Sequence, residues 1–263
     1  MYVPQLKPLS FGEILDGAFT LYRRHFSTLV VTALLPQIPV VGLQILQASV
    51  RPDGAGLLVV GLVGLLAIPA YLASYALCRG ALVQEASSAY LGQPVSRSAA
   101  FTVARKRFWA ILGTGILAWL AILIGFCLFG VPGILLSIMF FASDIVAVLE
   151  GTAGPAALAR SRELARGAWL RISGIWMMLV IIIYMPIIAL GIGGVLAAPR
   201  FTSGMSPETS RLVVAGIQVG GALLGALVQP LVVLGMTLLY YDRRVRTEAL
   251  DLVDATAAAP AFA

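Results

Sequence analysis

Asp144 and Glu150 stand out because they interrupt or border a long apolar stretch of the chain. An ionisable side chain within a membrane segment is costly, so it usually faces a partner or a water-filled cavity. Asp144 is therefore a candidate intramembrane polar site, either as a proton or cation site or as half of an ion pair near the membrane boundary. We favour the ion pair because the estimated depth is shallow. The residues expected to take part in such pairs are Arg79, Arg171 and Glu150.

Gln37 and Gln229 are the other candidate polar residues within the apolar stretches. Each lies beside a proline, Pro36 or Pro230, and an interior proline removes a helix hydrogen bond and bends the helix. The freed carbonyls next to these amides could coordinate a substrate or an ion, as in the broken helices of transporters. Neighbouring helices can equally re-satisfy the carbonyls, and no paired charge accompanies either glutamine.

The sequence contains none of the patterns that usually carry enzymatic chemistry. The single histidine, His25, has no second metal ligand or carboxylate in pattern with it. Cys78 and Cys127 lie inside apolar runs without a CxxC spacing, so we expect them to be small buried hydrophobic residues. Nucleophile, zinc and phosphate-loop motifs are missing as well. The sequence therefore predicts no catalytic residues, no metal and no cofactor.

Basic residues gather just before several apolar runs, where they usually fix orientation and meet anionic lipid head groups. The net charge of +6 could otherwise suggest nucleic-acid binding. We exclude nucleic acid because the basic residues adjoin apolar runs rather than covering a folded surface. The candidate head-group contacts are Arg23, Arg24, Arg105, Lys106, Arg107 and Arg166.

The composition requires a solvent other than water. Hydrophobic residues make up 60% of the chain and charged residues only 11%, and the mean hydropathy is +0.96. A soluble domain carries about 25% charged residues, because its surface must be hydrated. The chain is therefore predicted to be an all-α polytopic membrane protein.

Intervals without charges predict six transmembrane helices, since about 20 apolar residues cross the hydrocarbon core. One interval, residues 108–143, is too long for a single span. Its cluster Gly130-Val131-Pro132-Gly133 is expected to form a turn that divides it. The predicted spans are 26–50, 54–78, 108 to the turn, the turn to about 149, 172–199 and 212–241.

The distribution of basic residues predicts the orientation. Fifteen of the 18 lysines and arginines fall on the side that holds both termini, whereas Arg51, Arg200 and Arg211 fall on the other side. Cytoplasmic loops carry the excess of Lys and Arg. We therefore expect a multi-pass protein of the cell inner (cytoplasmic) membrane with both termini in the cytoplasm.

Amphipathic helices are expected on the cytoplasmic side. Apolar residues recur at steps of three and four from Ser10 to Phe26, and Ser10 with Glu13 matches a capping box. Similar segments before residues 108 and 169 suggest three units of amphipathic helix plus hairpin, at about 8–78, 94–149 and 155–241. Residues 1–248 would form one transmembrane domain, and 249–263 a disordered tail.

Glycines four residues apart occur in the last predicted span, at 216 and 220 and again at 221 and 225. Such spacing lets two helices approach closely. We expect packing within the chain, with a homo-oligomer contact as the alternative.

Three stretches resemble a bacterial family named for a glycerophosphoryl diester phosphodiesterase membrane domain. They are PLSFGEILD at residues 8–16 with LYRRHF at 21–26, VLEG at 148–151 with the segment from Ala157 to Trp169, and LYYDRRVRTE at 239–248. The resemblance implies a six-helix membrane module, sometimes fused to a catalytic domain, with no established activity of its own. It transfers no catalytic residues to this chain, and Asp144 matches no family motif.

Two functions of different kinds follow from these features. The leading hypothesis is a non-catalytic membrane module that organises anionic lipids or protein partners at the cytoplasmic leaflet. The alternative is a transporter or channel for a small or lipidic substrate that uses the proline-broken helices.

Overall fold

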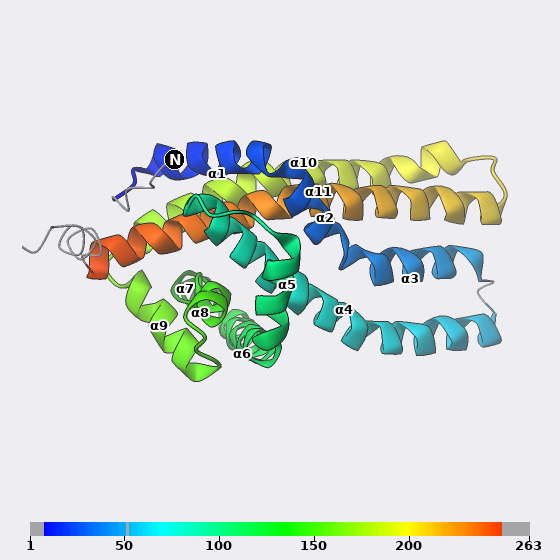
Figure 1. Cartoon of the computed structure of the whole chain (residues 1–263). Coiled ribbons are helices and arrows are strands. Elements are labelled where there is room, and N and C mark those ends of the chain that lie inside the picture. The colour runs from blue at the N-terminus through cyan, green and yellow to red at the C-terminus, as the bar shows by residue number, and fades with distance from the viewer. Residues whose placement is uncertain (1–7, 51–52, 249–263) are drawn as a thin grey trace, which may run out of the picture.

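The protein folds entirely into helices over the residues that its computed structural model describes, 8–50 and 53–248. The predicted tail at 249–263 lies outside the described residues, as does Arg51. In chain order the helices are α1 (Phe11–Arg24), α2 (Phe26–Leu34), α3 (Gln37–Ser49), α4 (Gly54–Tyr90), α5 (Arg97–Lys106), α6 (Phe108–Cys127), α7 (Val131–Met139), α8 (Ser143–Leu149), α9 (Pro155–Ala165), α10 (Trp169–Thr202) and α11 (Pro207–Glu248) (Figure 1).

Helix α1 begins at the predicted capping box, which the structure confirms. The Glu13 N–H donates to the Ser10 hydroxyl at 3.2 Å, and the Ser10 N–H donates to the Glu13 carboxylate at 2.6 Å. These two bonds satisfy backbone donors that the first helical turn leaves free. The apolar stripe, with Ile14 and Ala18 fully buried, packs along α11.

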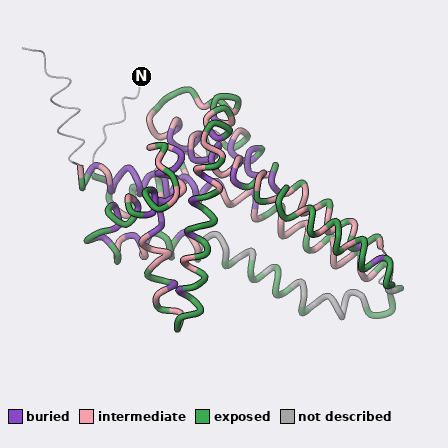
Figure 2. The backbone as a smooth tube through the Cα atoms, turned by 90° about the horizontal axis from the view of Figure 1, so that it is seen from below, coloured by how far each residue is buried: buried purple, intermediate pink, exposed green. Residues whose placement is uncertain are grey.

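Buried residues concentrate at the end of the molecule that holds both ends of the described chain (Figure 2). We call this region the packed base. It consists of α1, α2, α8, α9, the last turns of α4, the first turns of α10 and the last turns of α11. Small residues allow this packing: a Cβ on Gly235 would lie 2.7 Å from a Leu179 methyl, and one on Gly17 would lie 2.8 Å from a Leu238 methyl.

Beyond the packed base, apolar side chains face outward. The most apolar 18-residue window of α4 is only 6% buried inside the protein. Since exposing so many large apolar side chains to water would be unfavourable, lipid must surround this part of the chain. Helix α4 also continues past the predicted end at Cys78 to Tyr90, because Ala81, Leu82 and Val83 are buried in the base.

Four helical segments are long and apolar enough to cross a membrane, or up to six if two bent pairs each count as one span. The structure thus confirms an all-α polytopic membrane protein. The first predicted span is divided into α2 and α3, which meet at a 48° bend next to Pro36. The fifth predicted span lies within α10, and the sixth within α11.

A turn divides residues 108–143 as predicted and produces a hairpin of α6 and α7, but it lies at residues 128–130, and Val131, Pro132 and Gly133 of the predicted turn begin α7. Phe129 and Gly130 both have positive φ, at 69° and 78°, which is the conformation that reverses the chain. The fourth predicted span is not continuous, because a turn at residues 140–142 separates α7 from α8. In Figure 1 the hairpin is seen nearly end on, while α10 and α11 run across the page, so the hairpin runs in a different direction.

Two glycines let the hairpin legs touch through their backbones. A Cβ on Gly125 would lie 2.8 Å from the Gly133 nitrogen, and a Cβ on Gly133 would lie 2.7 Å from the Phe126 nitrogen. Backbone atoms cannot rotate away from such a clash as a side chain can. A side chain at either position therefore forces the two legs apart.

We expect Gly133→Ala to lower the free energy of unfolding by about 1–3 kcal/mol, the usual cost of overpacking. Thermal unfolding in detergent, followed by circular dichroism, measures the change. Gly115→Ala on α6 is the matched control, because its Cβ would meet no atom within 4 Å and alanine favours the helix by up to about 1 kcal/mol. Equal melting temperatures for Gly133→Ala and wild type would contradict the backbone contact.

Candidate functional site

Asp242, on the last turns of α11, is a buried carboxylate of the packed base that has two arginine partners. Its side chain is fully buried, and it lies 2.9 Å from the Arg246 guanidinium and 3.2 Å from that of Arg171. The Leu9 N–H donates to the same carboxylate at 2.8 Å. Arg171 and Arg246 both also donate to the Leu9 carbonyl. One carboxylate therefore joins the start of the chain, α10 and α11.

Glu150 is the centre of a second cluster, which extends to the end of α11. Its carboxylate accepts from the Tyr240 hydroxyl at 2.8 Å and lies 3.1 Å from the Arg160 guanidinium. Arg160 also pairs with Glu248, which in turn pairs with Arg244 at 3.0 Å. Glu150 therefore pairs with an arginine of α9 that the sequence analysis did not single out.

Asp144 is paired rather than open to a cavity. The Arg79 Nε donates to its Oδ2 at 2.5 Å, so the structure brings together one of the two expected combinations. Arg171, the other expected partner, pairs with Asp242 instead. An ion pair of this kind neutralises the carboxylate in a region of low dielectric constant, and this geometry favours the ion-pair interpretation over an open cation site.

Arg243 and Arg107 use their charge to hold backbone carbonyls. Arg243 is buried and donates to the carbonyls of Leu164 at 2.8 Å and Arg166 at 3.0 Å, which satisfies free acceptors at the end of α9. Arg107 donates to the Val148 carbonyl at the end of α8. Arg107 thus differs from the other candidate head-group contacts, because its guanidinium is engaged inside the protein.

Sequence reasoning missed Glu85, a buried carboxylate near the end of α4. Only 1% of the residue is exposed, and its Oε1 accepts from the Thr32 hydroxyl at 2.9 Å. Its other oxygen has no hydrogen-bond partner among the described residues. The available signal was a single acidic residue in a run of small residues that follows Arg79.

The glutamine and proline pattern does not form an open polar site. Gln37 and Gln229 are both half-buried. Pro230 deprives the Ala226 carbonyl of its helical donor, and the adjacent carbonyl, that of Leu227, accepts from the Tyr22 hydroxyl at 2.6 Å. Helix α1 thus supplies a donor to the backbone of α11 beside the proline, at the carbonyl next to the one that Pro230 frees.

Three junctions between a short helix and an apolar helix present basic residues next to aromatic ones. Their exposed residues are Arg23, Arg24 and Phe26; Arg105, Lys106 and Trp109; and Arg166 and Trp169. We call these the basic junctions. Partial burial and the neighbouring Arg24 lower the pKa of His25, which disfavours the charged form of this imidazole. The charge of the junctions therefore comes from their arginines and lysine.

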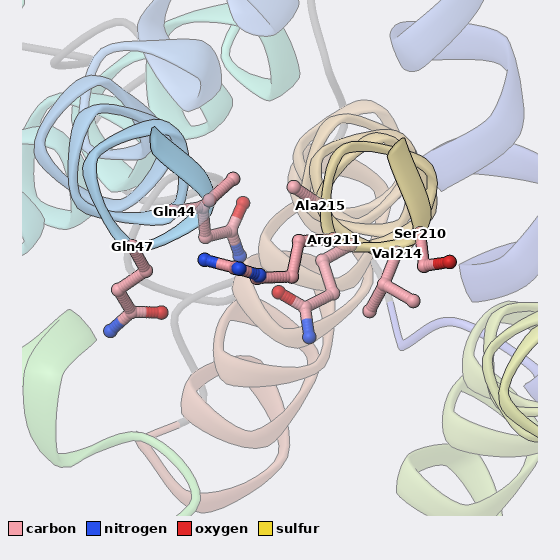
Figure 3. Close-up of a pocket in the computed structure, with 8 residues that line it drawn as sticks. Gln44, Gln47, Ser210, Arg211, Val214 and Ala215 are labelled. Atoms are coloured by element: carbon pink, nitrogen blue, oxygen red, sulfur yellow. The ribbon is translucent and has the colours of Figure 1, made fainter. Parts of the chain in front are cut away.

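A groove of about 290 Å³ lies between α3 and α11, toward the end of the molecule opposite the packed base (Figure 3). Its polar side chains are Gln44, Gln47, Ser210, Arg211 and Gln218. Arg211 donates to the Val50 backbone carbonyl at 3.1 Å. The side-chain oxygen of Gln44, Oε1, is buried without a hydrogen-bond partner in the described structure. These groups can hydrogen-bond a polar ligand, but the lining includes no carboxylate, thiol or imidazole for catalysis.

The structure corrects two expectations about small residues. Cys78 is buried as expected, but Cys127 at the end of α6 is exposed. The glycines at 216, 220, 221 and 225 do not serve a close contact within the chain, because a Cβ on any of them would meet no atom within 4 Å. Sequence spacing alone does not tell which face of α11 meets another helix.

No protein-family model, curated protein or solved structure matches this chain. Among the described residues, no three His, Cys, Asp or Glu side chains are grouped closely enough to hold a metal ion. The features of the protein that bear on its function are therefore the ion pairs, the basic junctions and the groove.

We expect Asp242→Asn to lower the free energy of unfolding by about 3 kcal/mol, because it leaves two arginines without their buried counter-charge. Thermal unfolding in detergent measures the loss. Glu163→Gln is the matched control: Glu163 is 59% exposed and 3.7 Å from Arg160, so its replacement should cost less than about 1 kcal/mol. Similar losses in the two variants would show that Asp242 does not hold the base together.

Proposed function

We propose that the protein is a non-catalytic integral membrane module that gathers anionic lipids, or the partners that carry them, on the side of its termini. The observation that carries this proposal is that arginines engaged inside the protein and exposed basic residues form two separate groups. Five arginines of the packed base, Arg160, Arg171, Arg243, Arg244 and Arg246, are engaged with carboxylates or carbonyls, whereas five basic residues of the junctions are exposed.

The junctions combine the two features that anchor a protein at the head-group level. Exposed aromatic rings favour the interface between water and hydrocarbon, and exposed basic residues are attracted to anionic lipids by about 1 kcal/mol each near the surface. Each junction also joins a short helix, α1, α5 or α9, to a more apolar one, α2, α6 or α10. Arg23, Arg105 and Arg166 can thus meet phosphate groups while Phe26, Trp109 and Trp169 enter the interface.

The excess of basic residues on the side of the termini supports a cytoplasmic placement of the packed base in the inner membrane. The hydrogen bond between Leu9 and Asp242 supports having both ends of the described chain at that same side. We also propose membership of the phosphodiesterase membrane-domain family, on the motifs at residues 8–26, 148–169 and 239–248. One of those motifs contains Asp242, which would make the buried ion pair a family feature.

The proposal predicts selective retention of anionic lipid by the purified full-length protein. Native mass spectrometry after incubation with equal amounts of phosphatidylglycerol and phosphatidylethanolamine counts the bound lipids. Wild type should prefer phosphatidylglycerol. A variant with glutamine at Arg23, Arg24, Arg105, Lys106 and Arg166 should lose that preference by at least about tenfold, since each charge contributes about 1 kcal/mol.

Two controls separate charge from structure. Exchanging arginine and lysine at the same five positions should keep the preference, and high salt should weaken it in wild type through screening. Equal binding of the two lipids by wild type would overturn the lipid proposal. A protein partner that co-purifies from native membranes regardless of lipid would favour the scaffold form instead.

A transporter or channel is the second candidate, and the groove at Gln44 and Arg211 is the observation in its favour. Polar side chains between two apolar helices can pass a solute only if the polar path continues toward the base. Swelling of proteoliposomes in sugars and salts of increasing size tests for such a path. Swelling that Gln44→Leu abolishes supports transport, whereas rates equal to those of empty liposomes count against it.

The outward-facing glycines of α11 leave room for a second copy of the chain. Small residues four apart permit close contact between helices, and these four glycines face open space. We propose a homo-oligomer contact along this face. Cross-linking of the Gly220→Cys variant in native membranes tests it, and a purely monomeric product would exclude it.

A further inference from the structure

The tip of the α6–α7 hairpin contains no polar side chain. From residue 119 to 136 the chain carries only apolar residues and glycine or proline, apart from Cys127. Phe129, at the turn itself, is 97% exposed, and Phe126, Leu128 and Val131 are exposed as well. A loop that enters water usually carries polar or charged residues. The environment that suits this tip is hydrocarbon.

The other two hairpins end differently. Asp53 starts α4 at the tip of the α3–α4 hairpin, and its carboxylate accepts from the Gly56 N–H at 2.7 Å. The tip of the α10–α11 hairpin carries Ser206, Thr209 and Arg211. Both of these tips can therefore lie in water or among head groups. The contrast sets the α6–α7 tip apart within the same protein.

Part of each leg of the α6–α7 hairpin is in contact with α9. On α6, the Thr114 hydroxyl accepts from the Gly154 N–H at 2.8 Å, and Ala118 packs with Leu158. On the return leg, the Ser161 hydroxyl donates to the Met139 carbonyl at 2.9 Å and accepts from the Ala142 N–H at 3.1 Å. Because α9 also exposes Arg162 and Glu163, it must lie in water or at the head groups.

Taken whole, α6 (20 residues) and the segment Val131–Leu149 (19 residues) are two of the four segments long enough to cross, but the parts of these legs beyond the contacts with α9 are too short. Residues 119–127 and 131–138 remain, and at 1.5 Å per residue they extend about 12–14 Å. The hydrocarbon core is about 30 Å thick, so this length matches about one leaflet. The hairpin also runs in a different direction from α10 and α11 (Figures 1 and 2), and tilt reduces its depth further if those two helices cross the membrane.

We propose that the α6–α7 hairpin is a monotopic insertion that enters the leaflet beside the packed base and ends among its acyl chains. The lipid tails of that leaflet are the binding partner of Phe126, Leu128 and Phe129. The number of complete crossings is then four rather than six, and both ends of the hairpin remain on the side of the base. A wedge in one leaflet also holds α5 and α9 against the head groups.

The native Cys127 allows a direct test, because it lies at the tip and the other cysteine is buried. Full-length protein with Cys78→Ala is first labelled at Cys127 with a nitroxide in detergent. The labelled protein is then placed in phosphatidylglycerol–phosphatidylethanolamine vesicles. Electron paramagnetic resonance with oxygen and with a water-soluble nickel chelate then measures depth. The matched control carries Ser206→Cys and Cys127→Ala, which places the label at the polar tip between α10 and α11.

The expected result is a label at position 127 that collides often with oxygen and rarely with nickel, at a depth within one leaflet. The label at position 206 should collide mainly with nickel. The proposal is overturned if the label at 127 is accessible to nickel, whether from the far side, as in a full crossing, or from the near side, as in a hairpin outside the membrane. Low accessibility to both reagents, as in a protein contact, also overturns it.

Discussion

The buried carboxylate of Asp242 is the constraint on which the rest of the structure depends. An unpaired charge at this position would be costly to bury, and the fold supplies two guanidinium groups and a backbone N–H around it. Satisfying that charge brings the segment at Leu9 to the end of α11 and brings the start of α10 to the same place. Helix α1 is thereby directed along α11, where Tyr22 reaches the backbone beside Pro230.

The packed base behaves like the interior of a soluble protein, while the rest of the chain depends on lipid. In the base, small residues and fully buried side chains surround the ion pairs, so helices approach closely and carbonyls at helix ends find arginine donors. Outside the base, the apolar helices expose many of their large side chains. Lipid replaces protein as the packing partner of those side chains, which explains why long apolar helices can leave them exposed.

Function then follows from where charge is neutralised and where it is not. Carboxylates hold the partly buried arginines of the base, and backbone carbonyls hold the buried Arg243, which removes those residues from lipid or ligand binding. The basic junctions keep their charge exposed next to aromatic rings, at the level where anionic head groups lie. A module of this form can recruit lipids or partners without catalysing a reaction, and the monotopic hairpin would press the same face of the base against the membrane.

The sequence by itself determined the fold class, the start of α1 and the segments that face lipid, because these depend on local periodicity, capping and apolar length. The box at Ser10 and Glu13 and the turn at Gly130 are examples. It also indicated that Asp144 needs a counter-charge near the membrane boundary.

Only the tertiary structure decided that Arg79 is that partner, that Arg171 pairs with Asp242, that Glu85 is buried against Thr32 and that Arg107 caps α8. Partners more than 40 residues apart depend on how helices cross, and a linear pattern contains no information on crossing. The same reason explains why Cys127 faces outward and why an interval long enough for two spans forms a hairpin with only short free legs.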